Sequence, residues 1–196
     1  TRGKNATKNY GQYLAEKLNA NVTNLAVGGA TFSTVSSNNI FNQATNIKNA
    51  DLVIIQGTDD DWLWESGVPI GTDKMDIKTY IGAFYQMVNL IRAQNKDVKI
   101  ISMTATRQLP VNGKIIRRRD TDKNGLKFTL EDYVNAHILA CTELDIPVFD
   151  AYHSNYIDVY NPAFRKFNMQ DGLHPNENIH EIIMYELLKN YYYFYG

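Results

Sequence analysis

The chain has 196 residues, of which 44% are hydrophobic and 21% are charged, and its net charge is −1. That length and composition suffice for one sizeable hydrophobic core, so we expect a single domain over residues 1–196. The near-zero net charge shows no basic or acidic excess of the kind that favours nucleic acid or anionic membranes, and we expect no nucleic-acid partner.

No apolar run approaches the roughly 18 residues that a membrane-spanning helix needs, and no basic-then-apolar segment opens the chain. We therefore expect a soluble protein, either cytoplasmic or secreted in a bacterium, and the sequence leaves the compartment and the oligomeric state open. The single cysteine, Cys141, lies on the apolar stripe of an expected helix and should be part of the core.

Helices and short strands rich in Val and Ile alternate along the chain. The expected helices cover residues 10–18, 77–91, 130–144 and 178–192, and the expected strands cover residues 22–27, 52–55, 98–103 and 147–149. Short, continuous apolar strands between helices are typical of a parallel sheet that is covered on both faces. The pattern predicts a doubly wound α/β fold.

Glycine-containing and polar segments follow the expected strands, as in residues 28–31, 57–62 and 104–107. The most informative segment, Asp171-Gly172-Leu173-His174-Pro175-Asn176, precedes the last helix. Ligands of open α/β sheets bind outside the carboxyl ends of the strands. An acid that orients a general-base histidine is half of a hydrolase's catalytic machinery, although Asp, Asn and Pro before a helix are also common as capping residues.

Three segments, in this order, resemble blocks of the SGNH, or GDSL-type, hydrolases. Residues 24–31 resemble the second block, residues 57–60 the third, G-x-N-D, and residues 171–176 the fifth, D-x-x-H. The resemblance implies an esterase on a flavodoxin-like three-layer α/β/α sheet, which acts on a small carbohydrate or lipid ester without an organic cofactor. It implies His174 as the general base, Asp171 as its orienting acid, and Gly29 and position 59 as the oxyanion hole.

The sequence departs from the family in two places. The first block, G-D-S, carries the nucleophile and should lie shortly before the helix that begins near Thr7, but the chain starts at Thr1. We expect that the parent protein carries this block upstream, or that another segment fills the gap, because a sheet without its central strand leaves backbone groups unpaired. The nearest hydroxyls, Ser33, Ser36 and Ser37, do not lie in a nucleophile-elbow sequence.

The second departure is Asp59, which stands where the family has an asparagine that donates to the oxyanion. An ionised carboxylate only accepts hydrogen bonds, so it would repel the developing charge. Two hypotheses follow: an esterase of reduced or altered activity, or a non-catalytic binding module that keeps the fold. Beside this block, Asp60, Trp62 and Trp64 either line a substrate pocket or, for the aromatic residues, pack over the core.

Residues 120–131 match the calcium-loop pattern D-x-[DN]-x-[DN]-G-x5-E. The candidate ligands of a structural calcium ion are Asp120, Asp122, Asn124 and Glu131. The alternative is a turn at residues 122–125, followed by a helix cap formed by Thr129 and Asp132. Of the other histidines, we expect His137, His153 and His180 to be structural or exposed.

Overall fold

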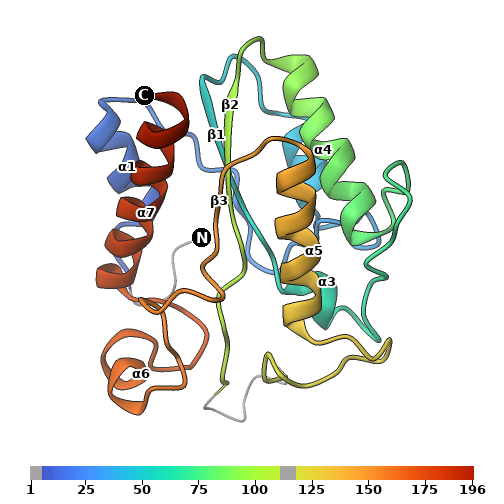
Figure 1. Cartoon of the computed structure of the whole chain (residues 1–196), viewed down its shortest axis with the longest axis vertical. Coiled ribbons are helices and arrows are strands. Elements are labelled where there is room, and N and C mark those ends of the chain that lie inside the picture. The colour runs from blue at the N-terminus through green and yellow to red at the C-terminus, as the bar shows by residue number, and fades with distance from the viewer. Residues whose placement is uncertain (1–5, 111–117) are drawn as a thin grey trace.

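The computed structural model describes residues 6–110 and 118–196. Its sheet contains β1 (Leu52–Gln56), β2 (Lys99–Met103) and β3 (Val148–Phe149), which are all parallel and lie in the order β1-β2-β3. Helices cover both faces of this sheet, which gives three layers (Figure 1). The predicted doubly wound α/β architecture is therefore confirmed.

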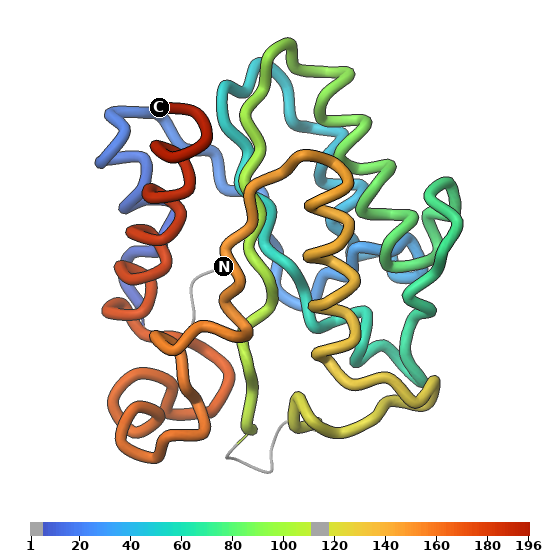
Figure 2. The backbone as a smooth tube through the Cα atoms, viewed as in Figure 1, coloured from blue at the N-terminus to red at the C-terminus, as the bar shows by residue number. Residues whose placement is uncertain are grey.

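The helices divide between the two faces (Figures 1 and 2). On one face lie α1 (Tyr10–Leu18) and α7 (Glu177–Tyr195), and on the other lie α4 (Tyr80–Gln94) and α5 (Leu130–Glu143). Shorter helices occupy the connections: α2 (Ile40–Ala44), α3 (Asp60–Leu63) and α6 (Pro162–Asn168). No described helix is long and apolar enough to cross a membrane.

Two hydrophobic cores lie on opposite faces of the sheet because strand side chains alternate between faces. In β2, Ile100 belongs to the core beneath α4 and α5, whereas Ile101 belongs to the core beneath α1 and α7. Burial on both faces explains why the strand sequences are continuously apolar. Cys141 is buried in the α4–α5 core, as expected.

Capping residues fix where the long helices begin. The Thr79 side chain accepts a hydrogen bond from the Gly82 amide, so α4 starts at Tyr80 and not at residue 77. Thr129 and Asp132 form the expected capping box at the start of α5. The last helix extends to Tyr195, beyond the predicted end at residue 192, because no helix-breaking residue precedes Gly196.

The predicted strand at residues 22–27 does not form. Val22 and Val27 are 49% and 53% exposed, and the segment makes no strand pairing in the described part of the chain. An apolar run provides a tendency to form a strand, but a strand also needs a neighbour that satisfies its backbone hydrogen bonds. That neighbour is missing from the described structure.

In residues 6–110 and 118–196, no strand pairs with the side of β1 that faces away from β2. Lys99 N donates to Asp51 O (3.0 Å) and Gly57 N donates to Met103 O (2.7 Å), so the odd-numbered residues of this strand pair with β2. The even-numbered residues of β1 are Leu52, Ile54 and Gln56, and their backbone N–H and C=O groups point away from β2. The described residues provide no hydrogen-bond partner for these groups.

Candidate active site

Asp171 and His174 form a tightly bonded dyad in the loop before α7. His174 Nδ1 lies 2.6 Å from Asp171 Oδ2, and the His174 amide donates to Asp171 Oδ1 at 2.8 Å. Burial alone raises the pKa of Asp171, but the hydrogen bonds from His174 and from the Leu173 amide outweigh it and bring that pKa below its ordinary value. The carboxylate is thus held ionised, and it fixes the proton of the imidazole on Nδ1.

The His174 side chain is 40% exposed, and no described residue forms a hydrogen bond or ion pair with its Nε2. With Nδ1 protonated, Nε2 carries the lone pair that can accept a proton from a nucleophile. This is the arrangement that a general base requires, with one ring nitrogen oriented by an acid and the other open to a reacting group.

Gly172 anchors the dyad loop to the segment that follows β2. Leu109 N donates to Gly172 O at 2.9 Å, and a Cβ on Gly172 would lie 1.7 Å from Leu109 O. The glycine also has a φ of +75°, which side-chain-bearing residues rarely adopt. Only glycine fits here, and the contact places the dyad at the carboxyl edge of the sheet.

A second Asp-x-x-His pair, which sequence reasoning missed, follows β3. Asp150 binds the His153 amide (3.1 Å) and ring Nδ1 (2.7 Å), so its local geometry repeats that of the first dyad. Here, however, His153 Nε2 faces Glu131 Oε1 at 3.2 Å. Partial burial alone would lower the pKa of His153, but the hydrogen bonds that its ring donates to the two carboxylates outweigh burial and raise that pKa. An imidazole flanked by two carboxylates holds its protons, so this pair is unsuited to general-base catalysis.

Ser102 and His137 form a buried serine–histidine pair with a structural role. Ser102 Oγ donates to Ile55 O at 3.0 Å and lies 2.8 Å from His137 Nε2. Because the only hydroxyl proton goes to the carbonyl, His137 Nε2 must carry its own hydrogen and donate to the serine. Both side chains are buried, and burial lowers the pKa of His137 to about 3. The serine is neither activated nor reachable, which agrees with the structural role expected for His137.

The glycine bend at residues 28–29 lies at the same carboxyl edge as the dyad. Gly29 has a φ of +77°, and the neighbouring Ala30 O accepts a hydrogen bond from Thr58 Oγ1 at 2.8 Å. Thr58 lies two residues after β1, Leu109 lies in the segment after β2, and parallel strands present their carboxyl ends on the same side of the sheet. The structure therefore brings the glycine bend, the Asp59 segment and the dyad loop to one edge.

Asp61, which sequence reasoning did not single out, joins two of these segments. Its carboxylate is fully buried and accepts hydrogen bonds from the Phe32 amide (2.5 Å) and the Ser33 amide (3.1 Å). Burial raises its pKa to about 6, although the hydrogen bonds oppose that shift. Asp61 thus holds the loop that follows Gly29 against α3.

A shallow pocket opens beside this junction. Its lining residues are Gly29, Asp60, Leu63, Trp64 and Glu65. Asp60 thus lies where a substrate-lining residue is expected. Trp62 does not: its side chain is fully buried, and Nε1 donates to Phe128 O at 3.1 Å. The expectation that Trp62 lines a substrate pocket is wrong because, on the single turn of α3, Trp62 faces the core while Trp64 faces the pocket.

The model of the GDSL-like lipase/acylhydrolase family matches residues 1–182 of this chain. The chain belongs to that family. No curated protein matches it. Among solved structures, the fold is similar to that of a protein from Lactobacillus plantarum, with a TM-score of 0.82 at 20% identity over 97% of this chain and 90% of the other.

Two further structures with this fold are those of a possible lipase and of a mutant form of an esterase. A possible lipase from Chitinophaga pinensis has a TM-score of 0.79 at 23% identity, over 96% of this chain and 89% of that chain. An acetyl-xylooligosaccharide esterase from Geobacillus stearothermophilus has a TM-score of 0.59 at 16% identity, over 96% of this chain and 87% of that one. These likenesses support the three-layer α/β/α fold of GDSL-like hydrolases.

The four candidate calcium ligands do not come together in the described structure. Asp120 is buried and bonds Tyr160 and Arg107, while Asp122 accepts from the Arg119 amide. The other two candidate ligands are engaged elsewhere, Asn124 with the Leu126 and Phe128 amides and Glu131 with His153. Within the described ranges, no three acidic, histidine or cysteine side chains form a metal site. The capped-turn alternative accounts for this loop.

Proposed function

We propose that this chain is the ester-hydrolysing domain of a GDSL-like hydrolase in which His174 is the general base. The observation that carries the proposal is the Asp171–His174 dyad, with its imidazole fixed at Nδ1 and open at Nε2. Family membership supports ester chemistry in general. The pocket beside Gly29 supports a small substrate.

The nucleophile in this proposal is a serine on a strand that pairs with the open edge of β1. Two observations support such a strand. The backbone groups of Leu52, Ile54 and Gln56 face that edge without a described partner. His180 is only 2% exposed, and neither ring nitrogen has a hydrogen-bond partner among the described residues. Its ring lies 5.8 Å from that of Tyr10, whose hydroxyl bonds the Gln56 side chain. Unpaired buried polar groups beside an unpaired strand are expected where a further segment packs.

The reaction then follows the acyl-transfer sequence. His174 Nε2 takes the serine proton as the serine oxygen attacks the ester carbonyl, and Asp171 stabilises the resulting imidazolium. The Gly29 amide donates to the oxyanion, and His174 returns the proton to the departing alcohol. Water, activated by the same imidazole, then releases the acid.

Asp59 lowers the rate in this scheme because an ionised carboxylate cannot donate to the oxyanion. Loss of one oxyanion-hole donor costs roughly 2.7 to 4 kcal/mol in the transition state, or a hundredfold or more in rate. We therefore propose a slow esterase acting on an acylated carbohydrate or lipid. The flat ring of Trp64 beside Asp60 and Glu65 favours the carbohydrate, since an aromatic face flanked by carboxylates suits sugar hydroxyls.

The alternative function is that of a binding module, which keeps the pocket but does not hydrolyse esters. Asp59 in place of the donor asparagine favours it, as does the lack of a hydroxyl at His174 Nε2 among the described residues. Hydrolysis of 4-nitrophenyl acetate separates the two, measured on a form of the protein extended upstream of Thr1 by its natural sequence. Turnover that requires His174 supports the esterase. Absence of turnover, together with retained binding of an acetylated sugar, supports the module.

A further inference from the structure

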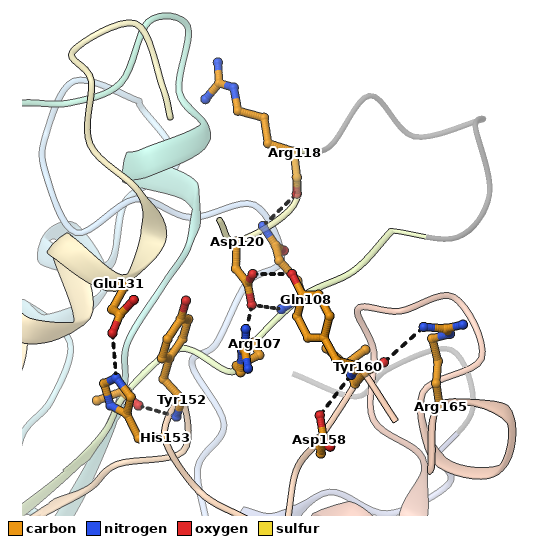
Figure 3. Close-up of polar contacts among 12 residues, drawn as sticks. Arg107, Gln108, Arg118, Asp120, Glu131, Tyr152, His153, Asp158, Tyr160 and Arg165 are labelled. Carbon is orange, nitrogen blue, oxygen red and sulfur yellow. Dashed lines mark hydrogen bonds and ion pairs between the residues drawn. The ribbon is translucent and has the colours of Figure 1, made fainter. Parts of the chain in front are cut away.

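Arg107 is held in a defined position at the carboxyl ends of the strands, where the dyad also lies. Its Nε donates to Asp120 Oδ2 at 3.2 Å, and its guanidinium lies between two tyrosine rings, 4.3 Å from the centroid of Tyr160 and 5.6 Å from that of Tyr152 (Figure 3). The side chain is 34% exposed. Stacking and the ion pair together restrict the rotamers of a side chain that is usually mobile.

Asp120 is a rigid support for this arginine. Its side chain is fully buried, Oδ1 accepts from the Tyr160 hydroxyl (2.5 Å), and Oδ2 also accepts from the Gln108 amide (3.1 Å). The carboxylate therefore contacts Arg107 through Nε alone. No described residue bonds the two terminal nitrogens of Arg107, Nη1 and Nη2.

The neighbouring arginines differ in this respect. Arg118 uses Nη1 on Trp62 O (3.0 Å) and Nη2 on Glu65 O (3.1 Å), and Arg165 Nη1 donates to Val159 O (3.2 Å). Those two are bound to backbone carbonyls, whereas the terminal nitrogens of Arg107 have no hydrogen-bond partner in residues 6–110 and 118–196. A fixed guanidinium with two free, parallel donors matches the two oxygens of a carboxylate.

The position of Arg107 connects it to the reaction. Leu109, two residues further along the same segment, donates to Gly172 O inside the dyad loop. The Arg107 backbone therefore lies close to the loop that carries His174, at the carboxyl edge where ligands of such sheets bind.

We propose that Arg107 binds a carboxylate on the substrate, so that the preferred ester is an acidic one. The statement that this carboxylate belongs to an ester substrate rests on the proposed function. The statement that Arg107 binds a carboxylate does not. The binding test uses the full chain and two probes that differ by one charge: monomethyl succinate, which has a free carboxylate, and dimethyl succinate, which has none. At fixed ionic strength, NMR follows the backbone amide signals of residues 107 and 108, which every variant retains, as each probe is added.

We expect a saturable shift with monomethyl succinate, none with dimethyl succinate, and at least a tenfold loss of affinity in Arg107→Gln. Arg119→Gln removes an equal charge from an exposed side chain nearby and should change the affinity less than twofold. Arg107→Lys keeps the positive charge but lacks the two parallel terminal donors, so its affinity should be intermediate. An intermediate affinity would show that the loss in Arg107→Gln does not come from misfolding. Equal shifts with both probes, no shift, or an equal loss in Arg119→Gln would overturn the proposal.

Measuring ester hydrolysis provides a second test of the proposal. In the upstream-extended form, Arg107→Gln should lower kcat/KM for the acidic ester at least tenfold relative to the neutral one. An equal decrease for both esters contradicts the proposal. If the extended form hydrolyses neither ester, the proposed function fails, and the titration still decides the role of Arg107.

Discussion

Replacing Asp61 with asparagine should change how the stability of the protein depends on pH. Burial raises the pKa of Asp61 from 3.8 to about 6. A group whose pKa is higher in the folded state contributes stability that is fully present below pH 3.8 and is lost as the pH rises through about 6. At about 1.4 kcal/mol per pKa unit, this difference corresponds to about 3 kcal/mol. The asparagine side chain does not titrate, so the variant lacks this contribution.

The assay is urea unfolding of both proteins between pH 4 and pH 8. The difference in unfolding free energy, native minus Asp61→Asn, should fall by about 2.4 kcal/mol across that range, because part of the contribution is already lost at pH 4, and most of the change should lie between pH 4 and pH 6.5. The difference must be used because His137 and His180, whose pKa values burial lowers to about 3 and about 4, change the stability of both proteins in the opposite direction. A difference that stays constant with pH would refute the reasoning.

Three further predictions concern the site. In the upstream-extended form, Asp171→Asn should lower kcat about 10⁴-fold because the imidazole loses its fixed tautomer, whereas Asp150→Asn, in the second dyad, should change kcat less than threefold; equal losses would contradict the assignment of the base. Gly172→Ala should lower the free energy of unfolding in urea by about 1–3 kcal/mol or more, because its Cβ would lie 1.7 Å from Leu109 O. Gly28 has open space around it, so Gly28→Ala should be nearly neutral. Similar losses in the two variants would show that the contact of Gly172 with Leu109 is unimportant. Asp59→Asn should raise turnover of 4-nitrophenyl acetate about a hundredfold by restoring an oxyanion donor, and an unchanged rate would remove Asp59 from that role.

Local sequence predicted the parts of the structure that local contacts determine. The dyad is one of these, because an acid and a histidine three residues apart on a glycine turn meet without help from the rest of the fold. The same spacing in Asp150 and His153 was equally readable, but only the structure shows Glu131 against the second imidazole. Spacing indicates a dyad, but it does not indicate whether the outer nitrogen is open.

Distant residues decide the alternatives that the sequence left open and the one strand that it predicted wrongly. Asp120 matches the first position of a calcium loop, but its oxygens are bonded to Tyr160 and Arg107. Residues 22–27 have the composition of a strand, but no described strand lies beside them. Trp62 follows a polar block, yet it faces the core on the single turn of α3. Long-range pairing and the direction of a short helix are not encoded in the spacing of neighbouring residues.

In the proposed mechanism, His174 removes the proton of a serine on a strand that pairs with the side of β1 facing away from β2. A fluorophosphonate probe, applied to the upstream-extended form and followed by mass spectrometry of the digest, identifies that serine. We expect one labelled serine, located in the strand that precedes α1, and labelling that falls sharply in His174→Ala. A label on any serine from Ser33 to Ser154, or labelling that is unchanged in His174→Ala, would contradict it.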